Sequence, residues 1–139
     1  MAYFVGGCLC GEVRYVASGE VLLILNCHCD DCKKATGSAF ATNVAMRRSN
    51  VTVTQGQVRQ FNHVSDAGNP KTKEFCGTCG AQLFSSTVGA ETVTIKAGSI
   101  DDARFIEPMA DIFVDSALPF ALRKSELPQV PRMPERSNS

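Results

Sequence analysis

Cys27-His28-Cys29-Asp30-Asp31-Cys32 brings three cysteines together within six residues, directly after the apolar run 21–25. Three thiolates form an incomplete tetrahedral shell for zinc. A zinc site with three protein ligands keeps one position open, which is typical of catalytic rather than structural sites. The other four cysteines lie elsewhere, as the pairs Cys8/Cys10 and Cys76/Cys79. The sequence therefore predicts two zinc ions per chain, one in an open site and one in a closed site.

Length and composition predict one globular domain. The chain has 139 residues, and 44% of them are hydrophobic, which is enough for one modest core. Net charge is zero, with 14 basic and 14 acidic residues, so we expect no nucleic acid partner. The apolar runs are too short to span a membrane, and residues 1–7 do not resemble a secretory signal. We therefore expect a cytoplasmic protein with no membrane association.

The cysteine count agrees with metal binding in that compartment. Seven cysteines cannot all pair as internal disulfides, and the cytosol keeps thiols reduced. Clustered cysteines there are more often metal ligands, and seven divides into a group of four and a group of three.

Short alternating runs separated by turns predict a mainly β fold of antiparallel strands with one or two short helices. The expected strands are 12–16, 21–25, 39–46, 51–54, 58–61, 82–85, 92–97 and 109–114. A short helix is expected over 30–35, capped by Asp30 or Asp31 and ended by Gly37. Residues 1–126 are predicted to form the single domain. Residues 127–139, which carry three prolines, are predicted to form a flexible tail.

Cys8-Leu9-Cys10 and Cys76-Gly77-Thr78-Cys79 each lie beside glycines, which let a backbone turn closely around a metal. Two such pairs predict a four-thiolate zinc site that joins the N-terminal strand to the middle of the chain. Buried free cysteines are the alternative, but they are common singly rather than in two tight pairs. A redox role for Cys76 and Cys79 is a weaker alternative, because no βαβ pattern precedes them.

The three-cysteine site is predicted to exchange a thiol. Zinc with three thiolates carries a net negative charge, so it activates water poorly but holds a further thiolate well. The alternatives are a structural site completed by Asp30, Asp31 or His28, and a redox cluster. His28 is expected to point away from the face of Cys27 and Cys29 and to act as a satisfied polar residue. His63 is expected on the surface.

Three motifs carry a resemblance to a known family. They are Gly7-Cys8-Leu9-Cys10-Gly11, the stretch from Asn26 to Phe40, and Phe75-Cys76-Gly77-Thr78-Cys79-Gly80. Together they resemble the glutathione-dependent formaldehyde-activating enzyme / centromere protein V family, from about Phe4 to about Phe120. The resemblance implies a β-tent fold, a structural zinc on the four-cysteine set and a catalytic zinc on Cys27, Cys29 and Cys32.

The resemblance also implies an activity. The family's named activity is S-(hydroxymethyl)glutathione synthase, a carbon–sulfur lyase in which the glutathione thiolate adds to formaldehyde. Lys73 lies where the family frequently has an arginine, and its ammonium could hold a substrate carboxylate; the alternative is an ordinary exposed lysine. A homodimer is a further expectation. The competing hypotheses are a non-catalytic zinc module that binds a partner, and a redox or metal-buffer protein.

Overall fold

The computed structural model describes residues 1–123 and 126–134, and these form a mainly β structure, as predicted. The strands are β1 (Ala2–Gly7), β2 (Arg14–Gly19), β3 (Val21–Cys27), β4 (Ala41–Arg47), β5 (Val51–Gln55), β6 (Val58–Val64), β7 (Pro70–Cys76), β8 (Gln82–Thr87), β9 (Thr92–Lys96) and β10 (Ala110–Ile112). The helices are α1 (Asp30–Thr36) and α2 (Pro119–Leu122), with short 3-10 turns η1 (Arg48–Asn50), η2 (Ala97–Ser99) and η3 (Val114–Ser116).

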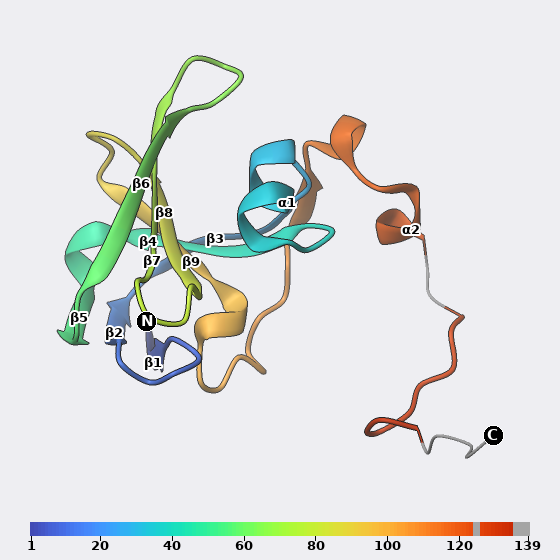
Figure 1. The fold of residues 1–139 in the computed structure, drawn as a ribbon, viewed down its shortest axis with the longest axis horizontal. Coiled ribbons are helices and arrows are strands. Elements are labelled where there is room, and N and C mark those ends of the chain that lie inside the picture. Colours follow the sequence, from blue (N-terminus) through green and yellow to red (C-terminus); the bar gives the residue numbers. More distant parts are fainter. Residues whose placement is uncertain (124–125, 135–139) are drawn as a thin grey trace.

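Two sheets make up the body of the molecule (Figure 1). The smaller has the order β1-β2-β5, and the larger has the order β10-β3-β4-β9-β8-β7-β6. Neighbouring strands are antiparallel except β10, which pairs with β3 in parallel. This pairing departs from the predicted antiparallel arrangement. It places the chain segment after β10 beside the cysteines that follow β3.

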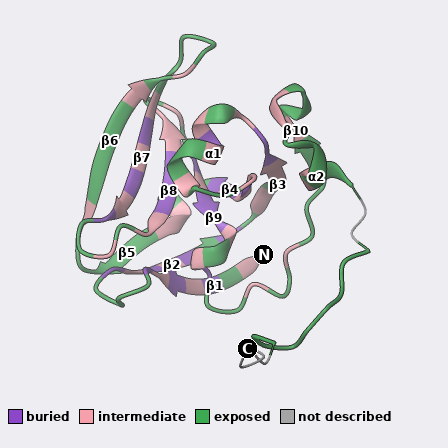
Figure 2. Cartoon of the chain, turned by 45° about the vertical axis from the view of Figure 1, so that its right-hand side comes forward, coloured by how far each residue is buried: buried purple, intermediate pink, exposed green. Residues whose placement is uncertain are grey.

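The larger sheet has one apolar face and one polar face. In β9 the side chains alternate, so Val93 and Ile95 lie in the core while Thr94 and Lys96 face the other side. The core also includes residues of the smaller sheet, such as Tyr15, so one hydrophobic cluster joins the two sheets. Figure 2 shows buried positions on strands of both sheets. The polar face, which lies next to α1, is therefore not part of this core and is available for a functional site.

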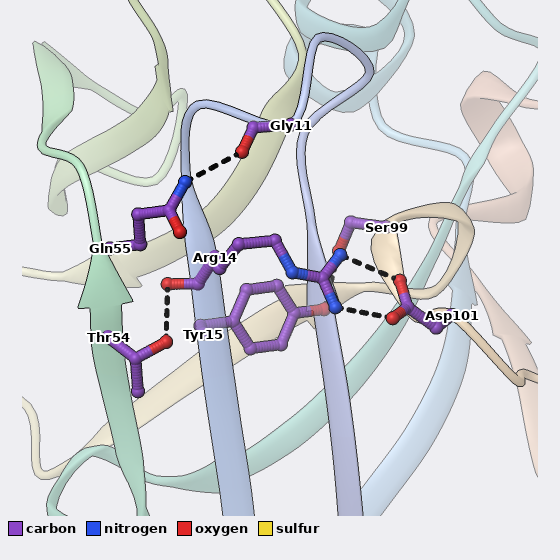
Figure 3. Close-up of polar contacts among 7 residues, drawn as sticks. All are labelled: Gly11, Arg14, Tyr15, Thr54, Gln55, Ser99 and Asp101. Carbon is purple, nitrogen blue, oxygen red and sulfur yellow. Dashed lines mark hydrogen bonds and ion pairs between the residues drawn. The ribbon is translucent and has the colours of Figure 1, made fainter.

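A polar network fastens β2 to the turn that follows β9 (Figure 3). The Tyr15 hydroxyl lies 2.7 Å from the Ser99 hydroxyl, and the guanidinium of Arg14 donates to both carboxylate oxygens of Asp101. The hydrogen bonds to Arg14 hold the pKa of Asp101 below its ordinary value. On the other edge of β2, Gln55 donates to the Gly11 carbonyl at 3.1 Å.

Gly6→Ala is expected to destabilise this junction. A methyl group at Gly6 would lie 2.3 Å from the Ser99 carbonyl oxygen and 2.4 Å from the Tyr15 hydroxyl. Overpacking of this kind costs about 1–3 kcal/mol, so the melting temperature should fall by several degrees. Thermal unfolding followed by circular dichroism measures it. Gly98→Ala is the matched control, because its methyl group would meet nothing within 4 Å. Equal melting temperatures for the two variants would contradict the expectation.

Several predicted strands differ from the structure, whereas the predicted end of the helix is confirmed. The sequence predicts no strand between 61 and 82, yet Pro70–Cys76 forms β7. Strand β6 runs to Val64, beyond the expected 58–61. The end of α1 is confirmed, because Gly37 takes the left-handed conformation with φ 67°.

The part of the chain that the structure describes has no helix long and apolar enough to cross a membrane. Residues 126–134 have neither helix nor strand. Residues 135–139 of the predicted tail lie outside the described residues. The single domain over 1–126 stays a prediction.

Candidate functional site

The four cysteines predicted to form the closed site lie together. Cys8 and Cys10 follow β1, and Cys76 and Cys79 lie at the end of β7; all four sulfur atoms are within 4.8 Å of one another. Cys10 Sγ is 3.6 Å from Cys8 Sγ and 3.8 Å from Cys76 Sγ. A tetrahedron with Zn–S bonds of about 2.3 Å has edges of about 3.8 Å. The donor set therefore fits zinc.

Backbone N–H groups point at sulfur atoms of this site. The amides of Thr78 and Cys79 donate to Cys76 Sγ at 3.4 and 3.5 Å. Hydrogen bonds from the backbone at Ala81 and Cys10 lower the pKa of Cys79 to about 6. Since metal ligation needs thiolates, these contacts prepare the site for a cation.

The other three cysteines also converge. Cys27 ends β3, Cys29 precedes α1, and Cys32 lies in its first turn, with all three sulfur atoms within 4.8 Å. The helix cap was predicted wrongly: Cys29, and neither Asp30 nor Asp31, is the N-cap, and its sulfur accepts the Cys32 amide at 3.2 Å. A cysteine sulfur thus replaces the usual oxygen as cap, so Cys29 belongs both to the cluster and to the cap of the helix.

The three thiols influence one another's ionisation. The hydrogen bond between Cys32 and Cys27 lowers the pKa of Cys27 and raises the pKa of Cys32, and burial adds to the increase at Cys32. Burial also raises the pKa of Cys29. Three adjacent thiolates therefore require a nearby positive charge, which a zinc ion would supply.

His28 is completely buried and anchors the loop of the three cysteines. Its Nε2 lies 2.9 Å from Asp111 Oδ1, and its backbone N–H donates to the Ile112 carbonyl at 3.0 Å. Its ring lies 4.9 Å from the Phe40 ring. The hydrogen bond to His28 also lowers the pKa of Asp111. The expected role as a satisfied polar residue is met at Nε2 only, because Nδ1 is buried and has no hydrogen-bond partner among the described residues. The contacts of His28 fix β10 against the loop of the three cysteines.

Phe113 follows β10 in a strained conformation. Its φ of 57° and ψ of 42° are left-handed, and among the described residues it is the only non-glycine residue with positive φ. The turn η3, which follows Phe113, is held by a hydrogen bond that the Lys33 ammonium donates to the Ser116 carbonyl. Phe113 lines the cavity described next. Strain of this kind is common at functional sites.

A cavity of about 380 Å³ adjoins the three cysteines. Its lining residues come from α1, from the polar face of the larger sheet, from the loop 65–69 and from the segment after β10. They are Cys27, Cys29, Asp30, Asp31, Cys32, Asn43, His63, Ser65, Asp66, Ala67, Asn69, Lys71, Lys73, Ser85, Ser86, Thr87, Thr92, Thr94, Ile112, Phe113 and Ser116. The polar face of the sheet is therefore the floor of a site that has the cysteines at one boundary.

Lys73 lines this cavity, and its role in binding a substrate stays a prediction. Within 1–123 and 126–134, no carboxylate pairs with it. His63 was wrongly expected on the surface. Its side chain is only 17% exposed and lines the cavity, with Nδ1 4.0 Å from Asp31 Oδ2.

Lys96 is a functional candidate that sequence reasoning missed. It is 7% exposed, and its ammonium donates to Asn43 Oδ1 at 2.7 Å. Burial lowers the pKa of Lys96 to about 8. The available signal was the alternation Thr92-Val93-Thr94-Ile95-Lys96, which places the lysine on the face opposite Val93 and Ile95.

Comparison with known proteins agrees with these features. A crystal structure of a Rhodobacter sphaeroides protein, a structural genomics target, aligns with a TM-score of 0.57 and 20% identity over 77% of this chain and 98% of that one. This likeness concerns the fold. No curated protein matches the chain. The family model described as glutathione-dependent formaldehyde-activating enzyme matches residues 3–116. The chain therefore belongs to the glutathione-dependent formaldehyde-activating enzyme family.

Proposed function

We propose that this protein is a zinc-dependent carbon–sulfur lyase of the S-(hydroxymethyl)glutathione synthase type, which joins a glutathione-type thiol to a small aldehyde. The observation that carries the proposal is one cavity that is lined by both the three cysteines and Lys73. A thiol with a carboxylate elsewhere in the molecule can use both features at once.

The chemistry is an addition to a carbonyl group. A bond forms between the thiolate sulfur and the aldehyde carbon, the carbonyl electron pair moves to oxygen, and that oxygen takes up a proton. Zinc bound by Cys27, Cys29 and Cys32 would supply a position that keeps the incoming thiol deprotonated. The same addition proceeds without an enzyme, so the protein contributes mainly positioning and a lowered thiol pKa.

The charges of the cavity suit a zwitterionic peptide thiol. Lys71 and Lys73 of β7 offer ammonium groups on the sheet side, and Asp30 and Asp31 offer carboxylates on the side of α1. Glutathione carries two carboxylates and one ammonium, which such groups can pair. A cavity of about 380 Å³ lies within the range of small-molecule sites. The phenyl ring of Phe113 adds an apolar wall.

The activity is tested by following exchange between glutathione, formaldehyde and their adduct by nuclear magnetic resonance, with zinc-loaded protein. The expected result is an exchange rate that rises in proportion to protein concentration, above the spontaneous rate. A rate that stays spontaneous at every protein concentration would leave a non-catalytic zinc module or a redox protein as the better assignment.

Lys73→Met is expected to weaken use of glutathione. A hydrogen bond to a charged group is worth about 1.5–3 kcal/mol, so KM for glutathione should rise about 10- to 100-fold with little change in kcat. With 2-mercaptoethanol, which has no carboxylate, the rates of variant and wild type should agree. Steady-state kinetics with the two thiols measures this. The control is Lys34→Met, which removes an exposed lysine of α1 that lies outside the cavity. Equal losses with both thiols would contradict a carboxylate-binding role.

We further propose that the protein works in the reducing cytoplasm, as one domain over 1–126 followed by a tail. All seven cysteines are free thiols in the structure, which suits that compartment. The balanced charge supports the absence of a nucleic acid partner. A homodimer remains a proposal for measurement in solution.

A further inference from the structure

Lys96 is a buried cation that has no acidic partner in the part of the chain that the structure describes. Among the described residues, its one hydrogen-bond acceptor is the neutral amide oxygen of Asn43, at 2.7 Å. None of the ion pairs among residues 1–123 and 126–134 includes it. A buried charge is costly unless opposite charge lies close by. The buried ammonium of Lys96 therefore needs nearby groups that can carry negative charge.

The strand register directs Lys96 towards the three-cysteine site. Cys27 on β3 pairs with Ala41 on β4, and Asn43, two residues further along β4, pairs with Lys96 on β9. Residues two apart on a strand share a face, and directly paired residues do as well. Cys27, Asn43 and Lys96 therefore lie on the same polar face, and the contact between Lys96 and Asn43 confirms the direction of the lysine.

The cysteine sulfur atoms are the groups whose negative charge would act on Lys96. Burial lowers the pKa of Lys96, whereas charge on Cys32, and to a smaller extent on Cys27 and Cys29, raises it. Lys73, a second cation in the same region, lowers it. Two lysine charges near three sulfur atoms form a site that gains stability as negative charge accumulates.

We propose that Lys96 is the counter-cation of the three-cysteine centre and that it makes this centre prefer an anionic fourth ligand, a thiolate, over a neutral one. The inference deepens the proposed function, since it rests on an open fourth position. A divalent zinc with three thiolates has a net charge of −1, and a further thiolate makes it −2. The ammonium of Lys96 offsets part of that charge without touching the reacting atoms, so it acts as a positioning residue.

A purely structural role is the competing explanation. The hydrogen bond to Asn43 and the packing of the lysine stem both contribute to the fold. If Lys96 had only this structural role, losing the hydrogen bond and the packing would weaken the binding of every ligand of the site to a similar degree. A charge effect, by contrast, weakens anionic ligands and spares neutral ones. The ratio of two affinities therefore separates the explanations.

The experiment uses protein with cobalt in place of zinc at the three-cysteine site, so that ligand binding changes the visible spectrum. It is titrated with 2-mercaptoethanol, which binds as a thiolate, and with imidazole, which binds as a neutral ligand. In Lys96→Met the Kd for 2-mercaptoethanol should rise about 10- to 100-fold, from the loss of one charge in a partly buried setting. The Kd for imidazole should change less than about threefold, and Lys96→Arg should restore the ratio of the two.

Two controls keep the result interpretable. Lys34→Met makes the same change in net charge at an exposed position of α1 and should leave both constants unchanged. Lys96→Gln retains an N–H donor for Asn43. It replaces Lys96→Met in the titrations if Lys96→Met does not fold. The metal content and melting temperature of each variant are measured alongside.

The outcomes are distinct. Equal changes for the two ligands, or no change, would overturn the role of Lys96 while leaving the proposed reaction intact. A wild-type centre that binds neither ligand would overturn both proposals. Selective loss of thiol binding in Lys96→Met would support Lys96 even if no aldehyde reaction is detected, and that combination would reject the proposed reaction alone.

Discussion

Cys29→Ser is expected to reduce the proposed aldehyde–thiol exchange to the spontaneous rate and to lower the zinc content from the proposed two ions per chain to one. Removing one of three thiolates should empty the open site, because serine is a poor zinc ligand beside two cysteines. The four-cysteine site shares no residue with it and should keep its metal. Exchange spectroscopy and metal analysis on the same sample measure the two effects.

Cys29→Ser separates metal binding from stability of the helix, because serine can still cap α1 as Cys29 does. The cysteine sulfur caps α1 by accepting the Cys32 amide at 3.2 Å, and serine is among the best N-cap residues. Helix and fold should therefore survive, and the melting temperature should change little beyond the loss of one metal. Cys29→Ala is the control: it should be equally inactive but less stable by about 1 kcal/mol through loss of the cap. Activity that persists in Cys29→Ser would place the reaction elsewhere.

The two cysteine clusters could be located from sequence because their ligands lie close together along the chain. Within each short motif the spacing of two to five residues already limits how the sulfur atoms can be placed. The long-range pairing of Cys8 and Cys10 with Cys76 and Cys79 followed from their number and their glycine neighbours. The structure brings these four within 4.8 Å, although they come from distant parts of the chain.

The cavity could not be predicted in the same way, because its floor depends on the register of several strands. Lys96 and Asn43 become neighbours only through the pairing of β9 with β4, and no local pattern fixes that register. The burial of His63 likewise depends on where β6 lies relative to α1. Strand β7 escaped prediction for a related reason: its core-side residues include Thr72 and Glu74, which are polar yet buried. Alternation of hydrophobicity is therefore weak there.

Cys76→Ser is expected to unfold the protein, in contrast to Cys29→Ser. Cys76 is fully buried within the hydrophobic core cluster, and it completes a site that ties the loop after β1 to the end of β7. Structural zinc sites supply about 10–16 kcal/mol of binding free energy, whereas small domains are stable by only about 5–15 kcal/mol. Loss of this zinc should therefore remove most or all of the free energy of unfolding.

The expected measurement is a thermal scan without a cooperative transition for Cys76→Ser, and the same result for wild-type protein after a strong chelator has removed both metals. Cys29→Ser serves as the matched control, since it exchanges the same sulfur for the same oxygen in the other cluster and should still melt cooperatively. This contrast depends on where each cluster lies. The four cysteines join segments that are far apart along the chain, so their metal closes a long loop, whereas the three cysteines span one strand end and one helical turn. If Cys76→Ser melts like wild type, zinc does not hold the fold together, and the division into a structural and an open site is wrong.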